Sequence, residues 1–320
     1  MLEYRITDEF AGVRLDKYLR RMLPNVPTSH LFKMIRVKKV RINGKRAQPE
    51  QDLVAGDVIT IRGAAEQLLA ETERAPPPKP RLDLGQLKVL YEDEWLLAMD
   101  KPSGMAVHPG SGITTGTAVD LVREYLGPKA VRNEFAPSPA HRIDRETSGV
   151  LLVAKRRPVM VHFTKVFTEH RAKKRYLTLV KGALPEPKGL IDVKLAEHQQ
   201  TAESRARRGV NLQEARTRYQ VLRQNPLAAY LECLIETGRT HQIRRHFTAI
   251  GHPVAGDPKH GDFAFNREVK AKWGLRRLFL HAARLEFPHP QDGRKVVVEA
   301  SLPLELDQVL ERAGLKLEER

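Results

Sequence analysis

In residues 1–62, apolar positions first follow a helical period and then alternate. A helix that ends at Pro24 is predicted by five apolar residues at helical spacing: Leu15, Tyr18, Leu19, Met22 and Leu23. Thr28 and Ser29 can cap a second helix that runs to about Val37. "VRINGKRAQ" then predicts a strand with a turn at Asn43-Gly44, and "GDVITI" predicts another strand. The pattern indicates a small α+β module.

After residue 85 the pattern changes to short apolar runs separated by turns. The runs that predict strands are "LKVLYED", "WLLAMDKP", "GVLLVAK", "RYLTLVKG", "TRYQVLR", "AYLECLIE", "LFLHAARLEF" and "KVVVEA". Helices are predicted over about 158–170, 240–250 and 304–314. Many strands with few helices between them favour an α+β fold with a mixed, largely antiparallel sheet. The regular strand–helix alternation of a doubly wound sheet is missing.

Residues 63–85, "GAAEQLLAETERAPPPKPRLDLG", separate the two patterns. Three consecutive prolines and a fourth at Pro80 favour extended polyproline geometry, which is typical of a semi-rigid spacer. We therefore expect a small domain at 1–62, a proline-rich linker at 63–85 and a large domain at 86–320.

Charge gives the first indication of a partner. The 320 residues carry 55 Lys and Arg against 39 Asp and Glu, a formal net charge of +16. Such an excess attracts polyanions, so nucleic acid or an acidic membrane surface is favoured. The single cysteine, Cys233, excludes an internal disulfide and indicates a reducing compartment. Because no signal-peptide pattern and no apolar run of about 20 residues is present, we expect a cytoplasmic protein. We also expect the protein to be a monomer.

The basic charge is concentrated in the small module. Between Arg20 and Arg46 there are nine Lys or Arg and no Asp or Glu. A charge run is often only a solvated face, but one of single sign across two helices and a hairpin favours phosphate binding. The module resembles the S-four-like RNA-binding fold through "RLDKYL", "TSHLFKMI", "VRINGK" and "AGDVI". Its candidate RNA-binding residues are Arg36, Lys38, Lys39, Lys45 and Arg46.

Lys38 departs from this resemblance, because a glycine commonly follows the second helix. Either the lysine adopts a left-handed cap at some cost, or the turn differs.

Three polar segments lie beside apolar strands of the large module. They are "HRIDRETSG" with Asp144, "HRAKKRYLTLV" with Tyr176, and "ETGRTHQIRRHF" with Arg244. Each alone has a structural explanation: a salt bridge, a half-buried aromatic residue and a capped basic helix. Together they supply a carboxylate, an aromatic ring with a hydroxyl group, and a guanidinium group.

This combination suits chemistry on a nucleobase. An arginine near Asp144 stabilises the ionised carboxylate, which can then act as a nucleophile or a general base. A stacked base must be extruded before it can react, and an aromatic ring can hold it. Asp16 repeats the local pattern in "RLD", but it falls in the first turn of a predicted helix, where a carboxylate suits the helix dipole. We assign Asp16 a structural role.

Other classes of site lack their signatures. His241 and His246 are five residues apart and so do not share a helix face, and no HExxH motif is present, which argues against a catalytic metal. No glycine-rich phosphate loop of the Walker or dinucleotide type is visible, and "GHPVAGDPKHG" is interpreted as an ordered loop. The nucleophile elbow of a serine hydrolase is also missing.

The ordered motifs resemble the RNA pseudouridine synthases of the RluA family, and within it the RluC and RluD group that acts on large-subunit (23S) ribosomal RNA. The resemblance covers nearly the whole chain and includes "LYEDEWLLAMDKPSGMAVHPG", "HRIDRETSGVLLVAK", "KRYLTLVKG", "TGRTHQIRRH" and "RLFLHAARLEFPHP". It implies a pseudouridine synthase fold behind the small RNA-binding domain. It also implies that a uridine's glycosidic bond is broken and that C5 of the uracil is joined to the ribose. No cofactor or metal is implied, because this isomerisation has no net redox change or group transfer.

The resemblance also implies roles for individual residues. Asp144 matches the essential aspartate, Tyr176 the tyrosine that packs on the target base, and Arg244 the basic partner of the aspartate. Tyr176 also matches a residue linked to proton removal from C5. Ile243 matches an apolar neighbour in the pocket, and Arg142 matches the arginine that takes the place of the flipped nucleotide. The same motifs contain further candidates for RNA binding: Lys101, His141, Arg239, His241 and Gln242.

Two alternatives stay open: a transfer-RNA or dual-specificity synthase of the same family, and a non-catalytic RNA-binding protein of ribosome assembly. Whether Asp144 attacks the ribose, attacks the base or removes a proton also stays open. His260 stands where many members carry an aromatic residue.

Overall fold

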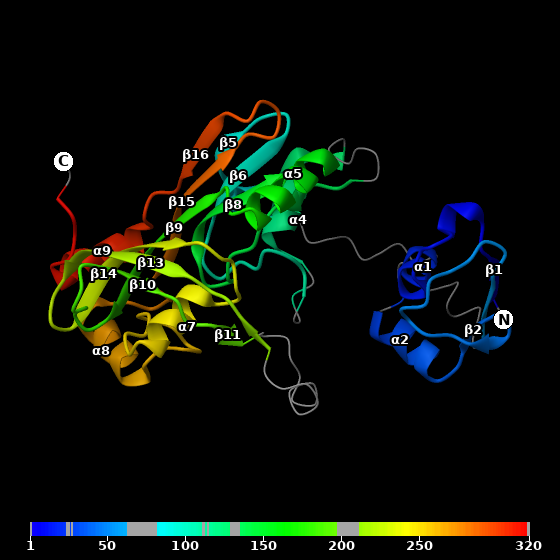
Figure 1. Cartoon of the computed structure of the whole chain (residues 1–320), viewed down its shortest axis with the longest axis horizontal. Helices are drawn as coiled ribbons and strands as arrows, with labels where there is room; N and C mark the ends of the chain where they lie inside the picture. Colours follow the sequence, from blue (N-terminus) through cyan, green and yellow to red (C-terminus); the bar gives the residue numbers. More distant parts are fainter. Residues whose placement is uncertain are drawn as a thin grey trace. The chain divides into compact units, whose positions relative to one another are not determined.

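The computed structural model describes residues 2–23, 26, 28–62, 82–110, 113, 115–128, 135–196 and 211–318. Two compact units are present, Met1–Pro80 and Arg81–Arg320. Figure 1 shows the first unit in blue and the second from cyan to red. Most of the expected linker, residues 63–81, lies outside the described residues, and the chain resumes at residue 82 just before the 3-10 turn η2 (Leu84–Gln86).

In the described residues of the small unit, two helices combine with a four-stranded antiparallel sheet of order β1-β4-β2-β3. Its elements are β1 (Leu2–Arg5), η1 (Asp8–Phe10), α1 (Leu15–Met22), α2 (Thr28–Arg36), β2 (Val40–Ile42), β3 (Lys45–Arg46) and β4 (Val58–Ile61). Leu15, Leu19 and Ile35 from the helices share one core with Ile42 and Ile59 from the sheet. The two helices and the strands predicted for this module are confirmed.

The hairpin between β2 and β3 and the turn after α2 both contain left-handed residues, for different reasons. At the hairpin between β2 and β3, Asn43 has a φ of 50° and Gly44 a φ of 73°, the signs that a type I′ turn requires. After α2, Lys38 has a φ of 62°. The lysine therefore takes the left-handed cap itself, at a cost of roughly 1–2 kcal/mol relative to glycine.

The large unit is built on a ten-stranded sheet in which β8 and β15 run parallel and the other paired strands are antiparallel. Its main path has the order β10-β13-β14-β9-β15-β8-β6-β5, with β16 paired to β15 and β7 paired to β8. The strands are β5 (Lys88–Glu92), β6 (Leu96–Lys101), β7 (Ser138–Pro139), β8 (Ser148–Ala154), β9 (Lys173–Lys181), β10 (Lys188–Ile191), β13 (Thr217–Gln224), β14 (Ala228–Ile235), β15 (Leu280–Pro288) and β16 (Lys295–Glu299). A separate pair is formed by β11 (Leu195–Ala196) and β12 (Leu212–Gln213). The predicted mixed, largely antiparallel α+β fold is confirmed.

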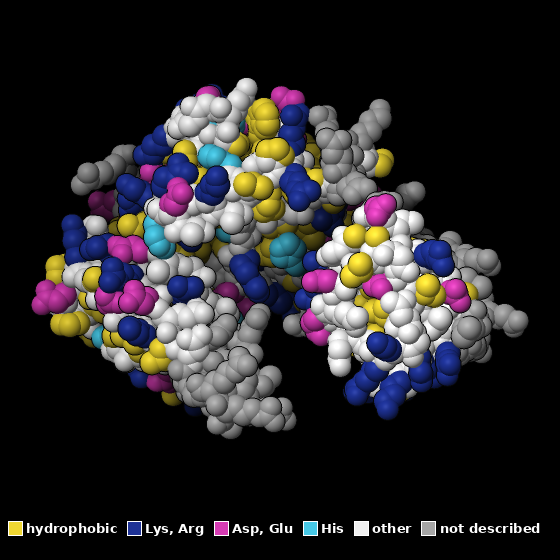
Figure 2. Space-filling model, turned by 45° about the vertical axis from the view of Figure 1, so that its right-hand side comes forward, with side chains coloured by type: hydrophobic (Ala, Val, Ile, Leu, Met, Phe, Trp, Pro, Cys, Tyr) yellow, Lys and Arg dark blue, Asp and Glu magenta, His cyan; other side chains and the backbone are white. Residues whose placement is uncertain are grey.

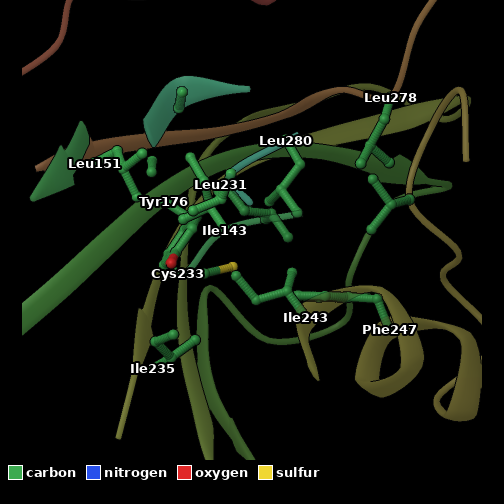
Figure 3. Packing of buried hydrophobic residues seen from close by; sticks show 14 of the residues in the cluster. Ile143, Leu151, Tyr176, Leu231, Cys233, Ile235, Ile243, Phe247, Leu278 and Leu280 are labelled. Atoms are coloured by element: carbon green, nitrogen blue, oxygen red, sulfur yellow. The ribbon is translucent and has the colours of Figure 1, made fainter. Parts of the chain in front are cut away.

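The sheet is covered on both faces, which is why β8 is buried along its whole length. In the described part of this unit the helices are α4 (Ala118–Leu126), α5 (Arg157–Thr168), α7 (Gln242–Ala249), α8 (Phe263–Trp273) and α9 (Leu304–Ala313). Because side chains alternate along a strand, Leu151 enters a core shared with α4 and α7, while Leu152 enters a second core shared with α5. Figure 3 shows part of the first core, in which Tyr176, Ile143 and Ile243 lie close to one another.

Helices α4 and α8 were not predicted from the sequence, although both carry start signals. Thr117 and Asp120 form a capping box at the beginning of α4. Asp262 caps α8 through two backbone N–H groups, and Gly274 ends that helix with a φ of 76°. The apolar residues in both segments are short and interrupted, so the caps were the better signal.

Candidate active site

Asp144 lies in the turn that leads into β8, and the motif around it is held by its own backbone. The N–H of Thr147 donates to the carbonyl of Asp144 at 3.1 Å. Nε2 of His141 accepts a hydrogen bond from the N–H of Leu152 at 3.1 Å. Gly149 has a φ of 111°, and a Cβ atom there would lie 2.3 Å from the carbonyl oxygen of Ala282 on β15. Only glycine fits this close approach, which fixes where the strand begins after Asp144.

A buried lysine ties a second loop to this turn. Nζ of Lys101 donates to the carbonyls of Pro102, Met105 and Arg145 at 2.8, 2.9 and 3.1 Å. The Lys101 side chain is fully buried, and burial lowers its pKa to about 7. The expectation that Lys101 binds RNA is therefore wrong in this structure, because its ammonium group is enclosed and occupied by carbonyls. It positions the turn that carries Asp144.

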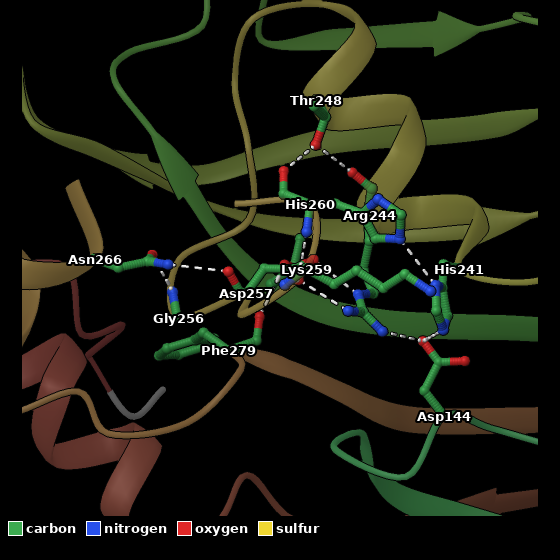
Figure 4. Close-up of polar contacts among 11 residues, drawn as sticks. Asp144, His241, Arg244, Thr248, Gly256, Asp257, Lys259, His260, Asn266 and Phe279 are labelled. Carbon is green, nitrogen blue, oxygen red and sulfur yellow. Dashed lines mark hydrogen bonds and ion pairs between the residues drawn. The ribbon is translucent and has the colours of Figure 1, made fainter. Parts of the chain in front are cut away.

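Arg244, from α7, lies between two carboxylates (Figure 4). Its Nη1 donates to Oδ2 of Asp144 at 3.0 Å, while Nε and Nη2 donate to Asp257 at 2.7 and 2.8 Å. The Arg244 and Asp257 side chains are 2% and 0% exposed, whereas that of Asp144 is 22% exposed. Of the two carboxylates bonded to Arg244, only that of Asp144 can be reached by solvent or substrate.

The electrostatics of the buried pair favour the charged forms of Arg244 and Asp257. Burial alone would lower the pKa of Arg244, but Asp257 and Asp144 outweigh it and the pKa is raised. Burial alone would raise the pKa of Asp257, but hydrogen bonds from Arg244 and from the N–H groups of His260 and Lys259 lower it. Asp257 was not identified from the sequence as a site residue. The only sequence feature that pointed to a role for Asp257 was its position in the glycine-rich loop "GDPKHG".

A cavity of about 330 Å³ opens beside Asp144. The residues around it that the sequence had suggested are Asp144, Tyr176, Arg142, Ile243, His141, Arg239, His241 and Gln242. Tyr176, on β9, is 7% exposed, and burial followed by the charge of Asp144 raises its pKa. Tyr176 therefore presents a neutral phenol to the cavity. Arg142 is exposed at the same cavity.

Phe167 and Lys174 are among the lining residues that the sequence interpretation missed. Phe167 and Lys174 lie at the cavity, with Nζ of Lys174 5.3 Å from the centre of the Phe167 ring. The ring of His141 lies 5.5 Å from that of Phe167. Burial, and then the charge of Lys174, lowers the pKa of His141 to about 3, so this imidazole is neutral. Lys174 belongs to the segment "HRAKKRYLTLV", but nothing in the sequence distinguished it from its basic neighbours.

Gln242 lines the cavity, but its amide group is hydrogen-bonded to other residues of the protein. Its Oε1 accepts from Oγ1 of Thr237 at 2.6 Å and from the N–H of Arg239 at 3.1 Å. Its Nε2 donates to the carbonyl of Arg216 at 2.9 Å and to Oγ1 of Thr217 at 3.1 Å. These four hydrogen bonds join the start of α7 to the preceding turn and to β13, and the expected RNA contact of Gln242 stays a prediction. Arg239 is exposed, with Nε bonded to the carbonyl of Glu214.

In the small unit, the candidate RNA-binding cations are all exposed: Arg36, Lys38, Lys39, Lys45 and Arg46. Figure 2 shows Lys and Arg side chains gathered along one edge of this unit. Lys33, Arg36 and Arg46 also line a hollow of about 340 Å³ together with the ring of Phe32.

Among the described residues, no three His, Cys, Asp or Glu side chains are grouped as a metal site would need. Within the same part of the chain, no helix combines the length and apolar character of a membrane span.

Comparison with known proteins gives a consistent result. Residues 95–249 match the family described as RNA pseudouridylate synthase, and residues 13–59 match the S4 domain. The chain is 38% identical over 307 residues to "Ribosomal large subunit pseudouridine synthase C" of Vibrio cholerae, covering 95% of this chain and 94% of that protein. The Escherichia coli protein of the same name is 38% identical over 311 residues, covering 96% and 95% of the two chains. Among solved structures, human RNA pseudouridylate synthase domain containing 4 matches with a TM-score of 0.59 and 26% identity, over 72% of this chain and 95% of that one.

Proposed function

Because the chain belongs to the RNA pseudouridylate synthase family, it is an RNA pseudouridine synthase, an isomerase, and we propose that its substrate is large-subunit (23S) ribosomal RNA. Both relatives named above carry the large ribosomal subunit in their names and align over nearly the whole of this chain. The S4 domain and the net charge of +16 supply the electrostatic attraction that an RNA substrate needs.

In this proposal Asp144 is the reacting carboxylate. The reaction breaks the bond between ribose C1′ and uracil N1, joins C1′ to C5, and exchanges the hydrogen on C5 for one on N1, so atoms and electrons balance. The observation that carries the assignment is the 3.0 Å contact of Asp144 with the buried Arg244 at the edge of a cavity. The hydrogen bond from Arg244 fixes the direction of this carboxylate.

The remaining lining residues suit a flipped uracil. A base drawn out of the RNA needs a flat apolar surface, which the ring of Tyr176 and the side chain of Ile243 offer. Arg142 is exposed at the mouth, where a guanidinium plane can stack in the gap that the extruded nucleotide leaves. A neutral Tyr176 can donate a hydrogen bond, but it would have to lose its proton before accepting one from C5.

The test of the catalytic assignment is Asp144→Asn, with Asp292→Asn as the matched control because Asp292 is an exposed carboxylate between β15 and β16. Pseudouridine formation should fall below detection in Asp144→Asn and stay unchanged in the control. RNA affinity should change by less than about tenfold, because binding is carried mainly by cations. Full activity in Asp144→Asn would remove Asp144 from the reaction.

The test of the substrate is pseudouridine mapping in cells with and without this gene. Loss of modified positions from large-subunit ribosomal RNA is expected. Loss confined to transfer RNA would overturn the substrate assignment and favour the alternative specificity.

The small unit can be tested separately through the salt dependence of RNA binding. Replacing Arg36, Lys39, Lys45 and Arg46 together by glutamine removes four exposed cations. The slope of log K against log salt should fall by about 3, since each phosphate contact contributes about 0.7–0.9. A control set of exposed cations in the large unit should leave the slope unchanged: Lys270, Lys272, Arg276 and Lys316. An unaltered slope in the first variant would contradict phosphate binding by the small unit.

A further inference from the structure

Two histidines form a pair next to the carboxylate of Asp144. Nδ1 of His241 lies 2.8 Å from Nε2 of His260, and Nε2 of His241 lies 4.0 Å from Oδ2 of Asp144 (Figure 4). His241 precedes α7 with a φ of 54°, a left-handed conformation that is unfavourable for a residue with a side chain. Such an outlier next to a reacting group is a reason to look for a function.

Both imidazoles are neutral at neutral pH. Burial is the largest cause that lowers the pKa of His241, to about 4, and burial likewise lowers the pKa of His260. The charged or titratable groups that face His241 include Asp144, Arg244, Lys259 and His260, and those that face His260 include Asp257, Arg244, Lys259 and Arg245. Two neutral rings 2.8 Å apart share one proton, so one ring donates and the other accepts.

The neighbouring carboxylate decides the direction of this hydrogen bond. If His241 donated from Nδ1, the lone pair of its Nε2 would face the negative charge of Asp144. If His260 donates, Nδ1 of His241 accepts and its Nε2 carries the proton toward Asp144. The second arrangement is favoured by electrostatics, because the hydrogen bond made by one ring nitrogen sets the protonation of the other.

The two side chains that approach the carboxylate of Asp144 do so at the same oxygen. Arg244 and His241 both reach Oδ2, and no hydrogen bond to Oδ1 comes from the residues that the structure describes. In Figure 4 the second oxygen of Asp144 points away from Arg244 and His241. One oxygen is thus held by the protein and the other is left for substrate.

We propose that His241 is a positioning residue whose Nε2–H, set by a hydrogen bond from His260, holds Oδ2 of Asp144 so that Oδ1 faces the substrate. This inference rests on the proposed catalytic role of Asp144. The 4.0 Å separation is longer than a hydrogen bond and has to shorten when RNA fills the cavity, as catalytic contacts often do on substrate binding.

The chain offers a sharp test at His260, because its backbone contacts do not need the imidazole. Its N–H donates to Asp257 and its carbonyl accepts from Thr248, both through the main chain. His260→Met removes the donor at similar length, and His260→Gln keeps an N–H donor near the place of Nε2. Thermal unfolding of both variants should match the wild type within a few degrees.

The first readout is the tautomer of His241, measured by two-bond ¹H–¹⁵N NMR on protein with labelled histidine and assigned with His241→Gln. His241 should carry its proton on Nε2 in the wild type and in His260→Gln, and should become a mixture in His260→Met. The second readout is steady-state pseudouridine formation, which gives kcat and KM. In His260→Met, kcat should fall about fivefold, as expected when one hydrogen bond is lost, and KM should change less than twofold. His260→Gln should restore at least half of kcat.

The outcomes separate this inference from the proposed function. An Nδ1–H tautomer of His241 in the wild type, or full kcat in His260→Met, would overturn the positioning role even if Asp144→Asn is inactive. Activity in Asp144→Asn would instead overturn the catalytic role of Asp144, whatever the tautomer of His241.

Discussion

Replacing Asp257 by asparagine tests whether the buried ion pair behind Asp144 holds the large unit together. Asp257 accepts two hydrogen bonds from Arg244, at 2.7 and 2.8 Å, and two from the N–H groups of Lys259 and His260, at 2.8 and 2.9 Å. Asparagine keeps one acceptor oxygen but turns an NH₂ group toward the guanidinium. It also leaves the cation with Asp144 as its remaining carboxylate.

The expected loss follows from this geometry. Breaking a buried ion pair by removing one partner costs about 3–5 kcal/mol. Because Arg244 retains its 3.0 Å contact with Asp144, the lower end applies, about 3 kcal/mol. For a unit of this size each kcal/mol lowers the Tm by about 2–4 °C, so a decrease of about 6–12 °C is expected. Calorimetry or circular dichroism of the full chain measures it.

The pH dependence has a defined sign. Hydrogen bonds from Arg244 and two backbone N–H groups lower the pKa of Asp257 below its ordinary value of 3.8, against the opposing effect of burial. A carboxyl group with a lowered folded-state pKa stabilises the protein above its unfolded pKa and loses that contribution as the pH falls through its folded pKa. The difference between wild type and Asp257→Asn should therefore be constant from about pH 5 to 8 and shrink below about pH 4.

The control is Glu268→Gln, which breaks the exposed 2.7 Å pair with Lys272 on α8 and should cost less than about 0.5 kcal/mol. A difference below about 1 kcal/mol for Asp257→Asn, or one that grows on acidification, would refute the reasoning.

Three further outcomes are expected. Gly149→Ala should lower stability by about 3 kcal/mol or more, because its Cβ would lie 2.3 Å from the carbonyl oxygen of Ala282. Gly293→Ala, with a φ of 71° and open space around it, should cost only about 1 kcal/mol, and equal thermal unfolding of the two would contradict this. Lys101→Met leaves three carbonyls without their donor and should cost at least about 2 kcal/mol in thermal unfolding, and wild-type stability would show that water replaces the ammonium. Burial raises the pKa of Cys233, so a thiol reagent should label it only after unfolding; labelling at native rates would show that β14 opens.

Much of the fold could be read from local patterns. The helix of the small unit from Leu15 and the Asn43-Gly44 hairpin follow from spacing and turn chemistry, which act within a few residues. Helices α4 and α8 were missed because their apolar patterns are short, although Thr117 and Asp262 carried capping signals. Lys38 showed the limit of local preference, since the turn kept its left-handed form without a glycine.

For the candidate site, the sequence determined which chemical groups are available: Asp144 in a glycine-bounded turn, Tyr176 on a buried strand and Arg244 on a basic helix. Only the tertiary structure decided how they are used. It buried Lys101 and Gln242 against backbone groups, and it placed Asp257 behind Arg244 and His260 behind His241. The physical reason is that periodicity and capping depend on neighbours along the chain. Hydrogen-bond partners and burial instead depend on which distant strands, here β8, β9 and β15, the sheet brings side by side.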